Sequence, residues 1–168
     1  MFTLQRKKNT ILGAGLLGAL AVGLTPAPAS AATATTTFQV TATVVATCLI
    51  SGNTLAFGNY TGVQLDGTTT LSVTCTNTTP YNVGLNAGTA TGATVTTRKM
   101  VNGANLLAYA LYSDSGRTTN WGNTVSTDTV PGTGNGSAQT LTVYGRIAAA
   151  QYVTPGSYAD TITATITY

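Results

Sequence analysis

The last eleven residues of the chain carry the pattern that most restricts its fold. Tyr158, Ile162, Ala164, Ile166 and Tyr168 share one phase of a two-residue period, and Ala159 alternates with them together with the threonines at positions 161, 163, 165 and 167. This alternation, with β-branched residues in both phases, predicts a β-strand. Thr and Gly, both poor helix formers, dominate much of the remaining chain. The sequence therefore predicts an all-β sandwich or barrel.

Further short alternating stretches are separated by turn residues along the whole chain. The expected strands are Phe38–Thr47, Thr54–Tyr60, Thr69–Cys75, Tyr81–Ala87, Thr94–Met100, Leu106–Tyr112, Gln139–Ile147 and Tyr158–Tyr168. Turns are expected where Gly, Asn or Pro favours a reversal: Ser51-Gly52-Asn53, Asp66-Gly67, Asn102-Gly103 and Thr154-Pro155-Gly156. Thr129–Ser137 is expected to be a surface loop, because it combines one Pro with three Gly.

The first 32 residues have the organisation of a secretory signal peptide. Arg6, Lys7 and Lys8 precede the apolar run Ile11–Leu24, and small residues follow it. The alternative is a membrane anchor, but a run of 14 residues is shorter than the roughly 20 that span a bilayer. We predict cleavage after Ala31 or Ala32, and therefore export of the chain.

Removal of this segment also removes the basic character of the chain. The whole sequence has a net charge of +3. The remainder carries four basic and four acidic residues and is neutral: Arg98, Lys99, Arg117 and Arg146 against Asp66, Asp114, Asp128 and Asp160. No basic patch is left for nucleic acid, so we expect no nucleic-acid partner.

Cys48 and Cys75 are the two cysteines of the chain. An even number in an exported protein predicts one disulfide. It would close a loop of about 27 residues and stabilise the fold by roughly 3–4 kcal/mol in the chain-entropy model. The alternative is a metal site, but the chain has no histidine to join the cysteines as ligands.

The predicted mature chain lacks the residues of common catalytic sites. It has no histidine and no glutamate, so neither a Ser-His-Asp nor a Cys-His set can form. The four aspartates are expected to form hydrogen bonds in turns and at strand ends, and Arg146 is expected to pair with Asp160. Trp121, the only tryptophan, is expected in the core or packed under a loop. We therefore expect no enzyme activity, no cofactor and no metal.

The segment after the predicted cleavage site is an apolar strand without a hairpin partner. Phe38, Val40, Ala42 and Val44 alternate with polar residues, and no turn joins them to the next strand. Such a strand must be paired, because an exposed apolar edge promotes aggregation. Composition favours pairing within its own domain; the alternative is pairing with another chain.

Several stretches, in this order and spacing, resemble the spore coat protein U domain, the subunit type of archaic (Csu-type) chaperone–usher pili. They are Leu55-Ala56-Phe57-Gly58-Asn59-Tyr60, Leu71-Ser72-Val73-Thr74-Cys75, Leu106–Asp114 with Trp121-Gly122, Val143-Tyr144-Gly145-Arg146-Ile147, Pro155-Gly156-Ser157-Tyr158-Ala159-Asp160 and Thr165-Ile166-Thr167-Tyr168. The resemblance covers nearly all of Phe38–Tyr168. A departure at Ile147-Ala148-Ala149-Ala150, where Pro or Gly is expected, affects one loop.

This resemblance implies an incomplete immunoglobulin-like β-sandwich that a strand donated by a neighbouring subunit completes. Residues 33–47 would be the donor strand, with Phe38, Val40, Ala42 and Val44 as the inserted side chains. Residues 48–168 would be the pilin domain. Its C-terminal strand would border the accepting groove through Ile162, Ala164, Ile166 and Tyr168.

The resemblance also implies the partners and the place of action. A periplasmic chaperone would fill the groove during export, and an outer-membrane usher would exchange the chaperone strand for that of the next pilin subunit. The membrane would be met only through the usher. The product would be a head-to-tail pilus at the cell surface that serves adhesion and biofilm formation.

Two other functions fit the sequence. An extracellular coat or matrix protein of the same fold would hold the N-terminal strand within its own domain and be a stable monomer. A soluble carbohydrate-binding module would need an exposed aromatic patch around Trp121.

Overall fold

The computed structural model describes residues 29–168, and its chain forms two compact units, Met1–Thr41 and Ala42–Tyr168. Most of the predicted signal peptide, residues 1–28, lies outside the described residues, and its cleavage stays a prediction. In the described part of the first unit, residues 29–41 are exposed and form no strand. Every strand found in residues 29–168 lies in the second unit.

Eight strands and no helix make up the described part of the chain, so the all-β prediction is confirmed. It follows that no described helix has the length and apolar character to cross a membrane. The strands are β1 (Cys48–Gly52), β2 (Leu65–Cys75), β3 (Pro80–Leu85), β4 (Arg98–Asn102), β5 (Asn105–Tyr112), β6 (Val130–Thr133), β7 (Ala138–Ile147) and β8 (Ala164–Thr167).

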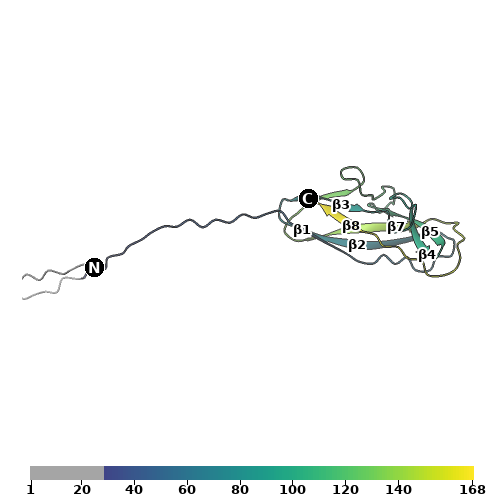
Figure 1. Cartoon of the computed structure of the whole chain (residues 1–168), viewed down its shortest axis with the longest axis horizontal. Coiled ribbons are helices and arrows are strands. Elements are labelled where there is room, and N and C mark those ends of the chain that lie inside the picture. Colours follow the sequence, from purple (N-terminus) through teal and green to yellow (C-terminus); the bar gives the residue numbers. More distant parts are fainter. Residues whose placement is uncertain (1–28) are drawn as a thin grey trace, which may run out of the picture. The chain divides into compact units, whose positions relative to one another are not determined.

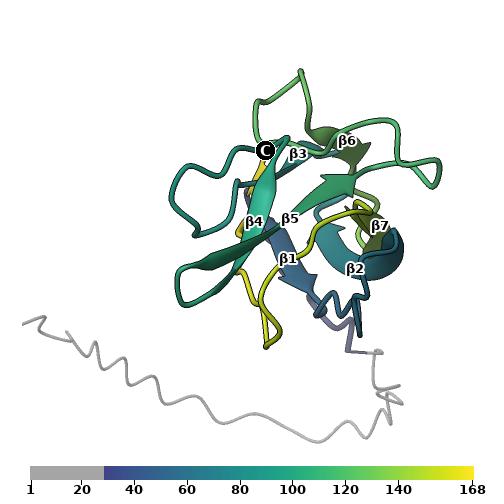
Figure 2. The ribbon, with the colours of Figure 1, turned by 90° about the vertical axis from the view of Figure 1, so that its right-hand side faces the viewer.

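The strands form two antiparallel layers. One sheet has the order β1-β2-β7-β5-β4, and the other has the order β6-β3-β8. Figure 1 shows strands of both layers running along the second unit, and Figure 2 separates β3 and β6 from β1 and β2. The core lies between the layers because alternate residues of each strand face inward; it includes Leu71, Val73, Val83, Leu111 and Val143.

The disulfide fastens the edge strand β1 to β2. Cys48 and Cys75 are direct register partners, and the bond between them is formed. Both cysteines are buried. The disulfide prediction is confirmed, and the bond closes the end of β1 at which the N-terminal segment joins the domain.

Arg98 and Trp121 fasten the two layers to each other. The guanidinium of Arg98 is fully buried and donates to four backbone carbonyls, those of Leu85, Asn86, Val95 and Trp121, at 2.6–2.9 Å. The indole of Trp121, 1% exposed, donates to the Val83 carbonyl at 2.8 Å. Burial lowers the pKa of Arg98.

The burial of Trp121 bears on the predicted core position of this residue and on the carbohydrate-binding alternative. It confirms that the tryptophan packs in the core. It also removes the exposed aromatic patch that the carbohydrate-binding alternative needed, because a ring that is 1% exposed offers no platform for a sugar.

The C-terminal segment crosses from one sheet to the other. Ala159 forms an isolated bridge with Val101 of β4, and β8 pairs with β3. Burial alternates from Tyr158 to Thr167 in the predicted phase. The predicted strand Tyr158–Tyr168 is nevertheless too long, because only Ala164–Thr167 has a ladder partner.

Three other predicted strands differ from the structure, two of them for the same reason. Phe38–Thr47 and Thr54–Tyr60 form no strand, because no described strand pairs with them. The strand predicted at Thr94–Met100 begins only at Arg98 and continues to Asn102, the point at which the hairpin to β5 turns.

Three predicted turns or loops also contain strands. Ser51 and Gly52 belong to β1, and Asp66-Gly67 lies inside β2. Leu55 and Phe57 pack closely against Gly67, because a Cβ at this position would lie 3.1 Å from each side chain. The expected loop Thr129–Ser137 contains β6, whose Val130 and Pro131 pair with β3.

We predict that Cys48→Ser with Cys75→Ser lowers the unfolding free energy by about 3–4 kcal/mol, because the unfolded chain regains the entropy of the open loop. Denaturant unfolding of the double variant measures this loss, and reduction of the parent protein serves as the control. Unchanged unfolding would show that the disulfide does not stabilise the domain.

We predict that Arg98→Met lowers the unfolding free energy by more than about 3 kcal/mol, because four buried carbonyls lose their donor. Lys99→Met is the matched control, since Lys99 makes a single bond to the Gly92 carbonyl, and a loss below about 0.5 kcal/mol is expected for it. Equal losses in the two variants would contradict the role given to Arg98.

Candidate functional site: an open groove beside the C-terminal strand

Two strand edges are open on one side of the sandwich. In the described chain, β1 pairs only with β2, and β8 pairs only with β3. The free edges of β1 and β8 belong to different sheets and lie near each other. An open edge presents unpaired N–H and C=O groups to any strand that can reach it.

An apolar groove of about 630 Å³ lies between these edges. One wall runs from Ile50 to Leu55 and includes Phe57, and the other runs from Tyr158 to Ile162 and includes Ala164. The bottom consists of core side chains from both sheets: Leu71, Leu85, Tyr109, Leu111 and Val143. These five core side chains line the groove but are only 2–7% exposed, so the groove walls still cover most of their surface.

The groove continues into a second hollow of about 700 Å³. The two hollows share Leu55, Phe57, Met100 and Tyr158. The second is bounded mainly by residues 55–62 and 151–158. Together they form one extended depression. Its walls include residues 54–62 and 160–163, which have no strand ladder in the described chain, beside the paired strands β1 and β8.

Leu55 and Phe57 reach the groove because the sheet behind them lacks side chains. Gly67 of β2 and Gly145 of β7 are register partners, and a Cβ on Gly145 would lie 2.7 Å from Leu55 and Phe57. Phe57 also packs edge-on against Tyr109, with ring centroids 6.2 Å apart. The two glycines therefore leave the space on the sheet into which the Leu55 and Phe57 side chains pack.

The predicted C-terminal groove residues divide into two groups. Ile162 and Ala164 line the groove. Ile166 is partly buried against the core, and Tyr168 is 57% exposed. The sequence analysis missed Asp160, which shares the phase of Ile162 and also lines the groove. It also missed Ile50, Leu55 and Phe57 as groove residues; the alternation of Leu55 with Phe57 was their signal.

The Asp160 carboxylate ties its wall to the rest of the domain. One oxygen accepts from the backbone N–H groups of Thr89 and Thr161, both at 2.8 Å, and from the Thr89 hydroxyl at 2.9 Å. The other accepts from the Tyr109 hydroxyl at 2.7 Å. Burial alone would raise the pKa of Asp160, but these bonds outweigh it and lower the pKa. Burial and the bond to Asp160 raise the pKa of Tyr109 far above its usual range.

The predicted pair between Arg146 and Asp160 is wrong. Arg146 of β7 faces Asp66 of β2, its direct register partner, and donates to both carboxylate oxygens at 2.7 and 2.9 Å. Asp160 forms its bonds on the groove side instead. The sequence could not show this, because the pairing depends on the neighbourhood of β2 and β7.

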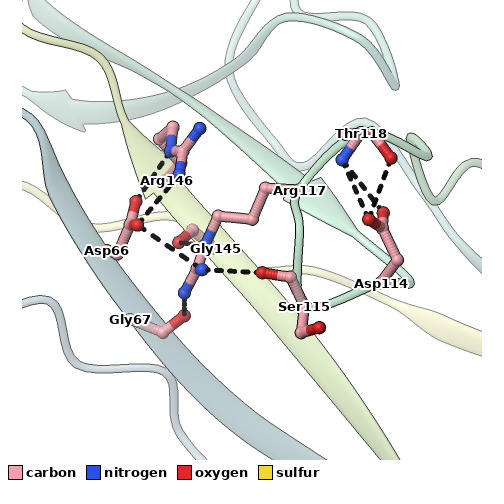
Figure 3. Close-up of polar contacts among 8 residues, drawn as sticks. All are labelled: Asp66, Gly67, Asp114, Ser115, Arg117, Thr118, Gly145 and Arg146. Carbon is pink, nitrogen blue, oxygen red and sulfur yellow. Dashed lines mark hydrogen bonds and ion pairs between the residues drawn. The ribbon is translucent and has the colours of Figure 1, made fainter.

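Figure 3 shows the cluster that contains Asp66 and Arg146, on the face of the five-stranded sheet away from the core. Arg117 lies 3.4 Å from Asp66 and donates to the Gly145 carbonyl at 3.1 Å. The hydrogen bond from Arg146 lowers the pKa of Asp66, so the pair adds stability above the usual carboxyl pKa and loses it on acidification below that value. Because both side chains are partly exposed, solvent screens this pair and its contribution to stability is small.

A second aspartate in Figure 3 confirms the predicted turn role. The Asp114 carboxylate accepts from the backbone N–H groups of Thr118 and Thr119 and from the Thr118 hydroxyl. The bond from Thr119, followed by those from Thr118, lowers the pKa of Asp114. Asp128 likewise accepts from the backbone N–H of Thr124. Asp114 and Asp128 therefore hold local turns, whereas Asp66 and Asp160 bond residues distant in sequence. No cluster with the composition of a metal site occurs in residues 29–168.

The proposed donor residues have no partner in the described chain. Phe38, Val40 and Val44 are 82–86% exposed, and Ala42 is exposed as well. Downstream, the backbone of Thr47 is fixed to Thr76: its carbonyl accepts from the Thr76 N–H at 3.0 Å, and its N–H donates to the Thr76 hydroxyl at 3.2 Å. The chain is thus fastened immediately before β1.

Comparison with known proteins places these features in a family. Residues 34–165 match the model of the Spore Coat Protein U domain, so the match includes most of the exposed N-terminal segment as well as the sandwich. Protein U of Myxococcus xanthus is 41% identical over 159 residues, which cover 84% of this chain and 88% of that protein.

The fold also has counterparts among solved structures. One is a chaperone–tip adhesion subunit pre-assembly complex from archaic chaperone-usher Csu pili of Acinetobacter baumannii, with a TM-score of 0.56 and 21% identity. The match covers 75% of this chain but only 41% of that chain. At this level of identity the likeness concerns the fold, and it confirms the predicted immunoglobulin-like sandwich.

Proposed function

Because this chain belongs to the spore coat protein U domain family, we propose that it is a pilus subunit that accepts a strand from one neighbour and donates its own N-terminal strand to another. The observation that carries the proposal is the apolar groove, open between the free edges of β1 and β8. The family is named for a structural coat protein, and the chain is a structural protein rather than an enzyme.

The N-terminal segment has the chemistry that the groove requires. A strand laid between two open edges gains main-chain hydrogen bonds on both sides, and every second side chain points into the groove. Phe38, Val40, Ala42 and Val44 would supply these side chains. Burial of the three larger ones contributes about 5–10 kcal/mol before the cost of ordering the segment.

The backbone just before β1 favours pairing of the N-terminal segment with another chain rather than with its own domain. To lie beside its own β1, the segment would have to reverse direction just before Cys48. Thr47 is bonded to Thr76, and Cys48 is bonded to Cys75, so the backbone there has little freedom to form such a turn. The sequence upstream of Cys48 also offers no Gly or Pro from residue 33 onward to make one. A head-to-tail contact of this kind does not close on itself and produces a fibre.

The proposed function gives a role to each part of the chain and to its expected partners. Residues 1–32 would direct export and be removed, residues 33–47 would be the donor strand, and residues 48–168 would be the pilin domain. The neighbouring fold comes from a chaperone–subunit complex of a chaperone–usher pilus, which supports a periplasmic chaperone that covers the groove before assembly. An outer-membrane usher would then exchange the strands, and the pilus would serve adhesion and biofilm formation at the cell surface.

A second candidate function rests on the family description and on the relative Protein U. Protein U is 41% identical and matches most of this chain. The matching family is the Spore Coat Protein U domain, and its description favours a coat protein of the same fold. In that function the N-terminal strand would fill the groove of its own chain, and the protein would be a stable monomer.

We predict that Phe38→Arg prevents polymer formation while the chain is still exported, because a guanidinium would have to be buried in an apolar groove. Electron microscopy and size-exclusion chromatography of exported protein measure the polymer. The matched control is Gln39→Arg, which places the same charge in the opposite phase of the strand and should leave the polymer intact.

Two outcomes would contradict strand donation. Normal polymer from Phe38→Arg would show that the segment does not enter a groove. A parent protein that is monomeric in both the exported and the purified state, and whose melting temperature a peptide of residues 35–47 does not raise, would favour the coat-protein function.

A further inference from the structure

The C-terminal wall of the groove lacks the hydrogen bonds that normally hold a strand. Between the bridge at Ala159 and the start of β8 at Ala164, no ladder joins the segment to a described strand. Its residues Asp160, Thr161 and Ile162 nevertheless line the groove. Something other than a sheet must keep this wall in position while the groove is open.

Asp160 attaches the wall to both layers of the sandwich at once. Tyr109, which donates to it, belongs to β5 of the five-stranded sheet. Thr89, which donates through its backbone and its hydroxyl, follows β3 of the three-stranded sheet. The space around the carboxylate is full, since a Cβ at Gly88 would overlap it. The carboxylate thus fixes the distance between the wall and each layer.

Asn86 fastens the next part of the wall. Its side-chain oxygen accepts from the Thr163 backbone N–H at 2.9 Å and from Gly88 at 3.1 Å, and its backbone N–H donates to the Thr163 carbonyl at 3.1 Å. The carbonyl of Asn86 accepts from the buried guanidinium of Arg98 at 2.8 Å. The wall is therefore linked through Asn86 to the clamp that joins the layers.

From this geometry, and resting on the proposed function, we infer that Asp160 is a positioning residue: with Tyr109 and Asn86 it holds the open wall in the arrangement that accepts a strand from a second copy of this chain. The side-chain bonds of Asp160 and Asn86 replace, before the strand arrives, the ladder that the strand later provides. Without them the wall would sample many conformations, and only a fraction would bind. The apparent affinity falls in proportion to that fraction.

The role differs from general stabilisation in what it predicts. A bond that stabilises the fold alone lowers the melting temperature equally with and without a bound strand. A bond that arranges the empty wall matters most when the groove is empty, because the ladder of a bound strand holds the same residues. It also affects the association rate of the strand, since the wall must be formed when the strand arrives.

The test uses the full mature chain with Phe38→Arg, so that its own segment does not compete for the groove. The probe is a synthetic peptide of residues 33–47 with the natural sequence. Asp160→Asn and Tyr109→Phe are added one at a time; the second removes a single oxygen atom and leaves the ring packing in place. Asp66→Asn is the matched control, because its carboxylate also pairs across strands but lies away from the groove.

We expect Asp160→Asn to lower the association rate of the peptide about tenfold, as a tenfold smaller competent fraction requires. Tyr109→Phe should lower it less, and Asp66→Asn should leave it within about twofold. Hydrogen exchange of the Thr89 and Thr161 amides should accelerate in Asp160→Asn without peptide. The loss of melting temperature should be larger without the peptide than at saturation.

Three results overturn the inference or its premise, and they can be told apart. An unchanged association rate in both Asp160→Asn and Tyr109→Phe, with peptide bound normally, overturns the positioning role alone. Equal losses of melting temperature with and without peptide make Asp160 a structural residue only. Absence of peptide binding in the Phe38→Arg background itself overturns the proposed function, and the positioning role with it.

Discussion

The open side of the hydrophobic core is the constraint on which the rest of the structure depends. Leu71, Leu111 and Val143 are core residues, yet they also form the bottom of a groove that no described strand covers. Backbone groups along such a groove require hydrogen-bond partners once water is excluded. A domain with such a groove is stable only if other interactions compensate for the side that no strand covers.

The compensating interactions lie at the points that an added strand would otherwise support. The disulfide holds β1, which would become an inner strand, against β2. Arg98 and Trp121 join the layers through backbone carbonyls, without a carboxylate partner for the guanidinium within ion-pair distance among the described residues. Asp160 and Asn86 hold the C-terminal wall. Each is polar or covalent, so each works without the apolar contacts that the open core lacks.

The sequence predicted the features that depend on local pattern and missed those that depend on the empty groove. Alternation identified β2, β5 and β7 and the phase of the residues from Tyr158 onward, because these residues face a core that exists in the single chain. The Cys48–Cys75 disulfide could be predicted because the chain has two cysteines and is expected to be exported. The partners of Asp160 and Arg146 could not be predicted, since each lies on a strand or segment distant in sequence.

The strand predictions that failed share one physical cause. Phe38–Thr47, Thr54–Tyr60 and Tyr158–Thr163 alternate as strands do, but none has a ladder partner in the described chain. The latter two are the walls of the groove, and the first has the side chains to fill it. A segment forms a β-strand only when its backbone is hydrogen-bonded to a neighbouring strand. The three segments would therefore become strands together if another copy of the chain supplied the first one. Under the proposed function, the alternation of these segments would belong to the assembled polymer, because one subunit alone lacks the strand that pairs with them.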